Sequence, residues 1–351
     1  MKTKNAGVRV TTGFTLVELL VVIAIIALGI GIVVPALGGA RDLARKTATT
    51  QTLGEINTAS AQYVNDKRSD PGYFTPREMG ALENGTRGFA AAQNIMLSLL
   101  DPKGVAVFTQ NGANRIAVGP IAGKEVFVDL TLLGGASSGA YFSTNSKNYV
   151  AQDGSPGAGL QVTSVAAHTQ LKTLVDGWGN PVLAWSRDYQ TTKTVVNLID
   201  YASIAFDAAI PSKFYANANV AFSQSTQLGK KGADQTDAYK GSILAAAVPA
   251  DIQNTICGIT GSPSSVLSAD LSKAYNLMLP QDSRGSLILQ SAGSNGVFVS
   301  RKERGVRNAG NILYFGLNYK NVAGQLNQAS NGGNLIDVRD GLDDIFQLSG
   351  G

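Results

Sequence analysis

The sequence predicts an α+β protein: a long N-terminal helix, membrane-spanning in its first half and amphipathic in its second, packed on an enlarged C-terminal head with an antiparallel sheet. Three observations lead to this fold class. Residues 14–37 form an apolar run, residues 41–66 continue it with apolar positions at helical spacing, and from about residue 104 short apolar runs alternate with Gly, Asn and Ser. One helix feeding a sheet is an α+β arrangement.

The composition fits an anchored head better than a helical soluble protein. Only 15% of the 351 residues are charged and 40 are glycines, which favours turns and strands over long soluble helices. The formal net charge is +4, but Lys2, Lys4 and Arg9 lie in the first 13 residues, and 26 basic and 25 acidic residues remain without them. No strong field for phosphates is left, so nucleic acid is not an expected partner.

Few side chains suited to catalysis are present. The single Cys257 and the single His168 exclude an internal disulfide and a Cys/His zinc cluster by count. A Cys–His nucleophile pair stays formally open, but a buried thiol and an ordinary histidine are the simpler interpretation. No nucleophile elbow, phosphate-binding loop, HExxH or dinucleotide fingerprint occurs, and the sequence predicts no enzyme.

Residues 14–37 read FTLVELLVVIAIIALGIGIVVPAL, with Glu18 as the one charge. A helix of this length, at about 1.5 Å per residue, crosses a hydrocarbon core of about 30 Å. A secretory signal peptide would be cut near Gly38-Gly39-Ala40, but its apolar run is usually only about 7–15 residues long. A plain signal anchor fits the length and leaves Glu18 unexplained, because a carboxylate at the centre of the membrane costs about 3 kcal/mol and is usually functional.

A third interpretation accounts for all of these features. The run Gly13-Phe14-Thr15-Leu16-Val17-Glu18 resembles the cleavage and methylation motif of type IV pilins and type II secretion pseudopilins. The resemblance implies that a prepilin peptidase cuts after Gly13 and N-methylates Phe14. It also implies that Glu18 pairs with the Phe14 amine of a neighbouring subunit, in keeping with the rule that a buried charge is tolerated when paired.

Pro35 also matches this family, in which the helix is commonly broken or kinked at about this point. Proline removes a backbone donor and clashes with the preceding turn. The resemblance therefore divides the chain into a leader (1–13), a transmembrane helix (14–37), an amphipathic continuation (38–70) and a head (71–351).

In the continuation, the apolar positions fall loosely on one helical face and Asp70-Pro71-Gly72 ends the helix. These positions are Leu43, Leu53, Ile56, Tyr63 and Val64. In the head, the pattern predicts a second helix over about 88–100, and strands at 125–130, 195–199, 287–290 and 297–299.

Residues 176–181, DGWGNP, followed by the apolar 182–185, are similar to the D-x-W-G-x-P turn and strand of type II secretion major pseudopilins. The residues themselves favour a structural role over ligand binding. Gly and Asn-Pro form a turn, and Trp178 covers the sheet.

Two further pieces carry the same resemblance. Residues 289–296, LQSAGSNG, resemble an S-x-G-x-D-G stretch, and residues 341–345, GLDDI, resemble a terminal D-D-I. In major pseudopilins these pieces together bind one calcium ion, which takes six to eight oxygen ligands. The resemblance thus implies a calcium site, for which the candidate ligands are Asn295, Asp340, Asp343 and Asp344, with Asp337 in reserve.

This carry-over has two departures. Asn295 stands where an acid is usual, and a long segment with the basic run 301–304 separates the pieces. A solvated acidic turn at the C-terminus is the alternative interpretation. A third departure is size: residues 186–285 are an insertion that a minimal pseudopilin lacks, with a polar stretch at 224–240 that reads as a surface loop. The sequence leaves open whether the insertion enlarges the head or forms a binding lobe.

The predicted function is that of a structural subunit of a type IV pilin-like filament, a pseudopilin of a type II secretion-like system. The resemblance implies a single-pass inner-membrane protein with its head in the periplasm or at the cell surface. Implied partners are further copies of the chain, the prepilin peptidase, the secretion platform protein and other pseudopilins. The alternative is a surface pilus or DNA-uptake pilin or adhesin whose head binds a ligand. A basic stripe would favour DNA uptake, and an aromatic-lined pocket would favour an adhesin.

Overall fold

The computed structural model describes residues 15–86, 89–101, 107–129, 131–133, 139–143, 148–151, 171–223, 241–246, 248–262, 279–303 and 338–349. The chain forms two compact units, Met1–Arg45 and Lys46–Gly351. Predictions that concern Gly13, Phe14, His168, Asp337 and the stretch 224–240 lie outside the described residues.

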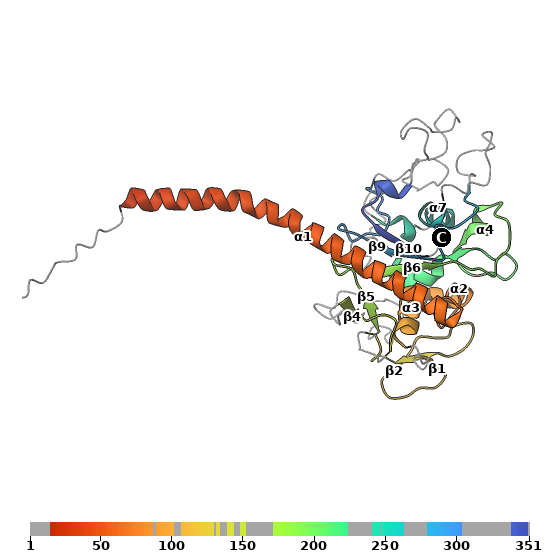
Figure 1. The fold of residues 1–351 in the computed structure, drawn as a ribbon. Helices are drawn as coiled ribbons and strands as arrows, with labels where there is room; N and C mark the ends of the chain where they lie inside the picture. The colour runs from red at the N-terminus through yellow and green to blue at the C-terminus, as the bar shows by residue number, and fades with distance from the viewer. Residues whose placement is uncertain are drawn as a thin grey trace, which may run out of the picture. The chain divides into compact units, whose positions relative to one another are not determined.

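The first element is helix α1, Leu16–Lys67 (Figure 1). Within the described part of the chain it is the one helix long and apolar enough to cross a membrane. Its large apolar side chains from Leu16 to Val33 are exposed, as expected of a segment that lipid covers. α1 continues through Pro35 as a helix, and the kink expected at this residue stays a prediction.

The C-terminal part of α1 belongs to the head. Thr49, Leu53, Ile56 and Ser60 are buried at successive i+4 and i+3 steps, the spacing of one helical face. Leu53 and Ile56 therefore confirm the predicted stripe, whereas Leu43 and Val64 are 66% and 37% exposed and do not belong to the buried face. The helix ends where Arg68 takes a left-handed conformation, with φ of 58°.

The centre of the head is a three-stranded antiparallel sheet with strand order β10–β9–β6. Its strands are β6 (Val182–Ser186), β9 (Leu287–Ser291) and β10 (Ile345–Ser349). β9 pairs with both neighbours, placing Leu289 opposite Ala184 and Gln347. All five β9 residues are buried, so both faces of this sheet are covered.

Side chains of the central sheet alternate between two hydrophobic cores. Val182, Ala184 and Leu289 pack with α1 and with α3 (Ala91–Leu100). Leu183, Trp185 and Ile288 pack in the second core, which is built with α7 (Pro249–Thr260) and its neighbours in the insertion. Figure 1 shows α3 and α7 on different sides of β6. The described part of the insertion therefore enlarges the head by covering the second face of the sheet.

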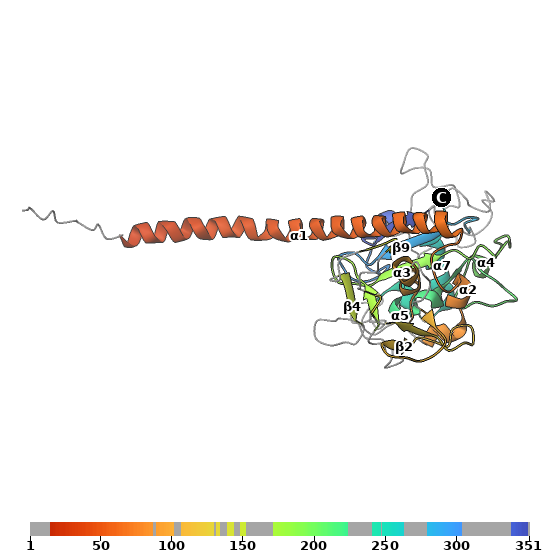
Figure 2. The same ribbon diagram turned by 60° about the horizontal axis from the view of Figure 1, so that its bottom comes forward.

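Short elements complete the head. On the α3 side of the central sheet lie two small antiparallel sheets (Figures 1 and 2): β1 (Val107–Phe108), β3 (Phe127–Asp129) and β2 (Arg115–Ala117) in this order, and β4 (Tyr149–Ala151) with β5 (Lys172–Leu174). The remaining elements are α2 (Pro76–Met79), η1 (Leu82–Thr86), α4 (Leu198–Tyr201), the parallel pair β7 (Ala202–Ser203) and β8 (Phe214–Tyr215), η4 (Ala216–Asn219), α5 (Val220–Ser223), η5 (Ile243–Ala245) and η9 (Val338–Gly341).

The structure confirms the α+β class, the second helix as α3, and the strands within 125–130 and 287–290 as β3 and β9. Two predicted strands are wrong. Residues 195–197 lead into α4, which begins at Leu198, and Asp200 Oδ2 accepts the backbone N–H groups of Val196 and Asn197. Residues 297–299 form a turn in which Asn295 Oδ1 accepts the N–H of Val297. In both places a side chain takes the N–H groups that a strand would use.

Candidate functional site

The N-terminal turn of α1 holds the predicted assembly residue Glu18. The backbone N–H and the hydroxyl of Thr15 both donate to Glu18 Oε2 at 2.9 Å, and the Glu18 N–H donates to Thr15 Oγ1 at 3.2 Å. This reciprocal pattern is a capping box. Sequence reasoning missed it, although the T-x-x-E spacing at residues 15–18 signals such a cap.

The cap leaves half of the carboxylate available. Glu18 is exposed, and its Oε1 has no hydrogen-bond partner among the described residues. One oxygen can therefore hold the helix terminus while the other accepts a cation from outside the chain. Pairing with a Phe14 amine stays a prediction, because Gly13 and Phe14 lie outside the described residues.

The turn at residues 176–181 joins three parts of the head. The Asp176 carboxylate accepts the N–H groups of Trp178 and Asn180, at 2.9 and 2.8 Å, and the Ser291 hydroxyl of β9 at 2.7 Å. From the α1 side, Thr49 Oγ1 accepts the Gly177 N–H at 2.9 Å. Burial raises the pKa of Asp176, against the hydrogen bonds that lower it. The expected structural role of this turn fits these contacts.

The same turn contacts the stretch at residues 289–296, and this stretch packs against the segment at residues 341–345. Asn180 Nδ2 donates to the Gly293 carbonyl at 3.2 Å. Gly293 has a φ of +64°, and a Cβ there would lie 2.4 Å from the Asp343 carbonyl oxygen. Only glycine allows these two backbones to approach so closely. Three segments that are far apart in the sequence thus meet at one place.

An acidic cluster forms where the last two segments meet. Carboxylate oxygens of Glu303, Asp343 and Asp344 all lie within 4.8 Å of one another. Asn295 Nδ2 donates to Glu303 Oε1 at 2.9 Å and to Asp343 Oδ1 at 2.8 Å. The structure therefore brings Asn295, Asp343 and Asp344 together. Asp340 is exposed in η9 and is not part of the cluster.

Glu303 is the member that sequence reasoning missed. It stands in the basic run 301–304, which counted as an argument against a cation site. Its Oε2 accepts the Ser300 N–H at 2.9 Å, and its Oε1 accepts the Asp343 N–H at 2.8 Å. The only sequence signal for its role was an acid standing alone among three basic residues.

Asp344 links the cluster to the interior. Its Oδ2 accepts the amide of Gln290, and Gln290 Oε1 accepts the indole N–H of Trp185 at 2.8 Å. Burial, reinforced by the neighbouring Asp343, raises the pKa of Asp344 to about 8. Burial and the adjacent carboxyl groups also raise the pKa of Glu303 well above its usual range.

These shifts have a chemical meaning. Three carboxyl groups this close cannot all be ionised near neutral pH without a compensating positive charge. The Asn295 amide supplies only a partial one. A divalent cation with oxygen ligands would supply the missing charge, so the donor set fits a hard cation such as calcium.

Cys257 does not take part in any such chemistry. It lies in α7, fully buried in the second core, and burial raises the pKa of its thiol far above the usual range. Such a thiol is unreactive.

Fold and sequence together fit a class, the single-pass membrane-anchored proteins: the part of the chain that the structure describes has one apolar N-terminal helix long enough to span a membrane and an α+β head. A family model described as the prokaryotic N-terminal methylation motif matches residues 9–34, the region that holds Gly13, Phe14 and Glu18. The chain carries the type IV pilin-like prepilin signature, which supports a pilin-family subunit and implies peptidase processing and filament assembly. Neither the curated proteins nor the solved structures gave a match.

Proposed function

We propose that the chain is a structural subunit of a type IV pilin-like filament, a pseudopilin of a type II secretion-like system assembled from the inner membrane. The observation that carries this proposal is the methylation motif at residues 9–34, which overlaps the start of one apolar helix. Peptidase cleavage after Gly13 creates a new amine at Phe14. The Oε1 atom of Glu18, unused by the helix cap, pairs with this amine on a neighbouring subunit.

The pseudopilin assignment rests on the head, which we place in the periplasm. The turn at 176–181, the stretch at 289–296 and the segment at 341–345 each resemble a segment of the major pseudopilins. The contacts among these three segments support the pseudopilin assignment. We further propose that Asn295, Glu303, Asp343 and Asp344 hold one calcium ion. The raised pKa values of Asp344 and Glu303 support a cation here. To bind through oxygen, the Asn295 amide must turn, because its N–H groups face the carboxylates.

The first test is mass spectrometry of the mature N-terminus. We expect a chain that begins with N-methylated Phe14. A chain that begins at Met1, or one cut near Gly38 to Arg41, contradicts the processing step.

The second test separates the two roles of Glu18. Glu18→Ala removes the Glu18 half of the capping box together with the intersubunit partner, whereas Thr15→Ala removes only the hydroxyl half of the box and leaves the Glu18 carboxylate in place. We expect both variants to be processed and membrane-bound, with filament yield lost in Glu18→Ala and largely kept in Thr15→Ala. Equal loss in both variants would assign the effect to helix capping, and normal yield from Glu18→Ala would remove Glu18 from assembly.

One observation favours a second candidate function, a pilin whose head binds a ligand. The head has an aromatic-lined cavity of about 280 Å³, and residues of the insertion form part of its lining.

A further inference from the structure

The cavity lies between the segment that follows α1 and the segment that follows β6. Residues 69–76 form one wall and residues 184–190 form the other, and Phe214 and Tyr215 of β8 also line the cavity. All of these residues belong to the head unit. The lining is mixed: aromatic rings are accompanied by the polar side chains of Asp70, Arg187 and Gln190.

The aromatic residues of the lining have their polar atoms occupied elsewhere. The Tyr73 hydroxyl donates to Asp101 Oδ2 at 2.7 Å, the Trp185 indole N–H donates to Gln290, and the Tyr215 hydroxyl donates to Asp188 at 3.1 Å. Trp185 and Tyr215 are each only 2% exposed and Phe214 is fully buried, so the rings that a ligand can reach are those of the half-buried Tyr73 and Phe74 and of the exposed Tyr189. Tyr189 is 52% exposed, and the Arg187 guanidinium lies 5.0 Å from its ring centroid.

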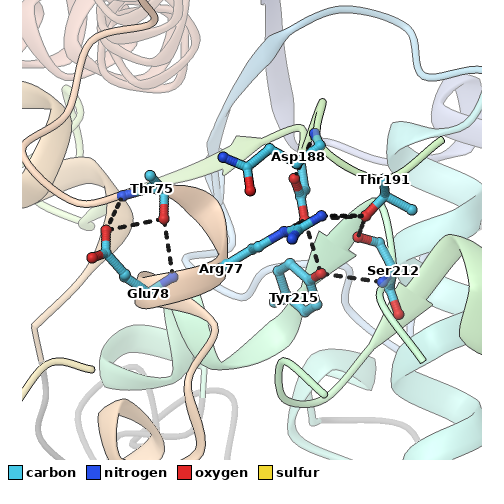
Figure 3. A network of polar contacts seen from close by, with 8 residues as sticks. Thr75, Arg77, Glu78, Asp188, Thr191, Ser212 and Tyr215 are labelled. Carbon is cyan, nitrogen blue, oxygen red and sulfur yellow. Dashed lines mark hydrogen bonds and ion pairs between the residues drawn. The ribbon is translucent and has the colours of Figure 1, made fainter. Parts of the chain in front are cut away.

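A buried polar network fixes the two walls against each other, as Figure 3 shows. Arg77 Nε of α2 donates to Asp188 Oδ2 at 2.6 Å, and the Asp188 side chain is only 2% exposed. Asp188 also accepts from the Thr191 hydroxyl, the Gln190 N–H and Tyr215. Asp188 has no capacity left for a ligand, and its role is to hold the cavity in shape. A pre-formed cavity binds without the cost of ordering its walls.

Other polar groups of the lining are free. Asp70 and the side chain of Gln190 have no hydrogen bond or ion pair among the described residues. Arg187 Nε is buried without an acceptor there, while its two Nη atoms reach Ser283 and Asp282. Because protein atoms cover Arg187 Nε completely, it does not offer a hydrogen bond to a ligand in the cavity.

We propose that this cavity binds one neutral sugar ring, as the end of a glycan. A pyranose presents C–H faces that pack on aromatic rings and a rim of hydroxyls that both donate and accept. The free groups match that rim: Asp70 accepts, and the Gln190 amide both donates and accepts. A purely apolar ligand would leave Asp70 and Gln190 unsatisfied, and an anion would meet the Asp70 carboxylate. The cavity is smaller than the pockets of about 300–1,000 Å³ that hold drug-sized ligands, which suits a single ring.

The fluorescence of a tryptophan in the lining can report binding to the cavity. Trp185 lines the cavity, and the second tryptophan, Trp178, does not. In a Trp178→Phe background, the emission of Trp185 is followed while glucose, galactose, mannose and N-acetylglucosamine are added separately. The full-length chain is kept in a polyoxyethylene detergent, because sugar detergents would compete. We expect a saturable change with at least one of the four sugars.

Variants at the mouth of the cavity complete the test. Tyr189→Ala is expected to weaken binding about tenfold, which corresponds to ~1.4 kcal/mol, and Asp70→Asn to weaken it at least about fivefold. Leu82→Ala, which shortens an exposed apolar side chain outside the cavity, should leave binding unchanged. Circular dichroism checks that each variant folds. If Tyr189→Ala does not fold, the binding result for Asp70→Asn alone tests the proposal.

Several results would overturn the proposal: no response to any of the four sugars, equal weakening by Leu82→Ala, or no weakening by Asp70→Asn. A response to inorganic phosphate or to the peptide Gly-Tyr-Gly without a response to sugars would assign the cavity to another ligand. Because the cavity belongs to the head alone, a negative result leaves N-terminal processing and filament assembly unaffected.

Discussion

The acidic cluster makes the stability of the head depend on pH and calcium in a direction that can be worked out. The pKa of Asp344 is raised from 3.8 to about 8 in the folded chain. Between these values the folded state keeps a proton that the unfolded chain has released. The associated stability is complete below about pH 4 and is lost as the pH rises towards 8. Asp176 and Glu303, whose pKa values are also raised, act in the same direction.

The size of the effect follows from the number of protons involved. One retained proton changes the free energy of unfolding by ~1.36 kcal/mol per pH unit, so raising the pH from about 5 to about 8 costs at most ~4 kcal/mol for Asp344. Relaxation and water entry lower this bound, and we expect about 2 kcal/mol, or roughly 4 °C in Tm. Calcium at 100 times its Kd contributes ~2.7 kcal/mol and should cancel the loss.

The assay is thermal unfolding of the full chain in detergent across this pH range, with either EDTA or calcium present. We expect Tm to fall with rising pH in EDTA and to stay level in calcium. Asp344→Asn should reduce the slope of the EDTA curve and weaken the calcium response, while Asp340→Asn, which changes an exposed acid outside the cluster, should change neither. Equal Tm values at both ends of the range in EDTA refute the linkage, and a calcium response that only Asp340→Asn removes refutes the ligand assignment.

Two further predictions concern the structure of the head. Arg77→Met leaves the Asp188 carboxylate buried without its cation and should lower the free energy of unfolding, measured in urea, by about 3–5 kcal/mol. The double variant Arg77→Met/Asp188→Asn should recover part of this loss. A loss below about 1 kcal/mol in Arg77→Met would mean that water solvates the ion pair. Gly293→Ala forces a Cβ to within 2.4 Å of the Asp343 carbonyl at a φ of +64° and should destabilise the head by about 1–3 kcal/mol and weaken calcium binding. Gly179→Ala is the matched control, because its φ is also positive but no atom lies within 4 Å of the new Cβ; it should be strained but bind calcium normally.

Much of the N-terminal helix α1 could be predicted from the sequence, because the signals that specify it are local. The apolar run predicts the helix, and the single acid near its start singles out Glu18. The spacing of Leu53 and Ile56 predicts the face of the helix that the head buries. The T-x-x-E spacing of the Thr15–Glu18 cap is an equally local signal, although sequence reasoning missed it. Local patterns of this kind do not depend on the rest of the fold.

The head was predicted less completely, because its key contacts join residues far apart in the chain. Glu303 enters the acidic cluster only because Asn295 and the Asp343 N–H bind it. The strand-like run at 297–299 is diverted into a turn because Val299 donates its N–H to Asp344. Asp343 and Asp344 lie 40 and 45 residues from their partners Glu303 and Val299, so no local window contains both, and propensity alone gave a strand where tertiary hydrogen bonds impose a turn.

Because both faces of the central sheet are buried in different cores, the register of β6 must be fixed, and the turn at residues 176–181 fixes it. In β6 the even positions Val182 and Ala184 face the α1 side, and the odd positions Leu183 and Trp185 face the insertion. A slip of one residue would exchange these faces and force Trp185 into the α1 core. The Asp176 carboxylate holds the turn immediately before β6 and also binds Ser291, the residue that pairs with Val182. The turn therefore fixes the register at the first pair of the ladder. With that register fixed, the insertion can enlarge one side of the head while the α1 side keeps its own set of side chains.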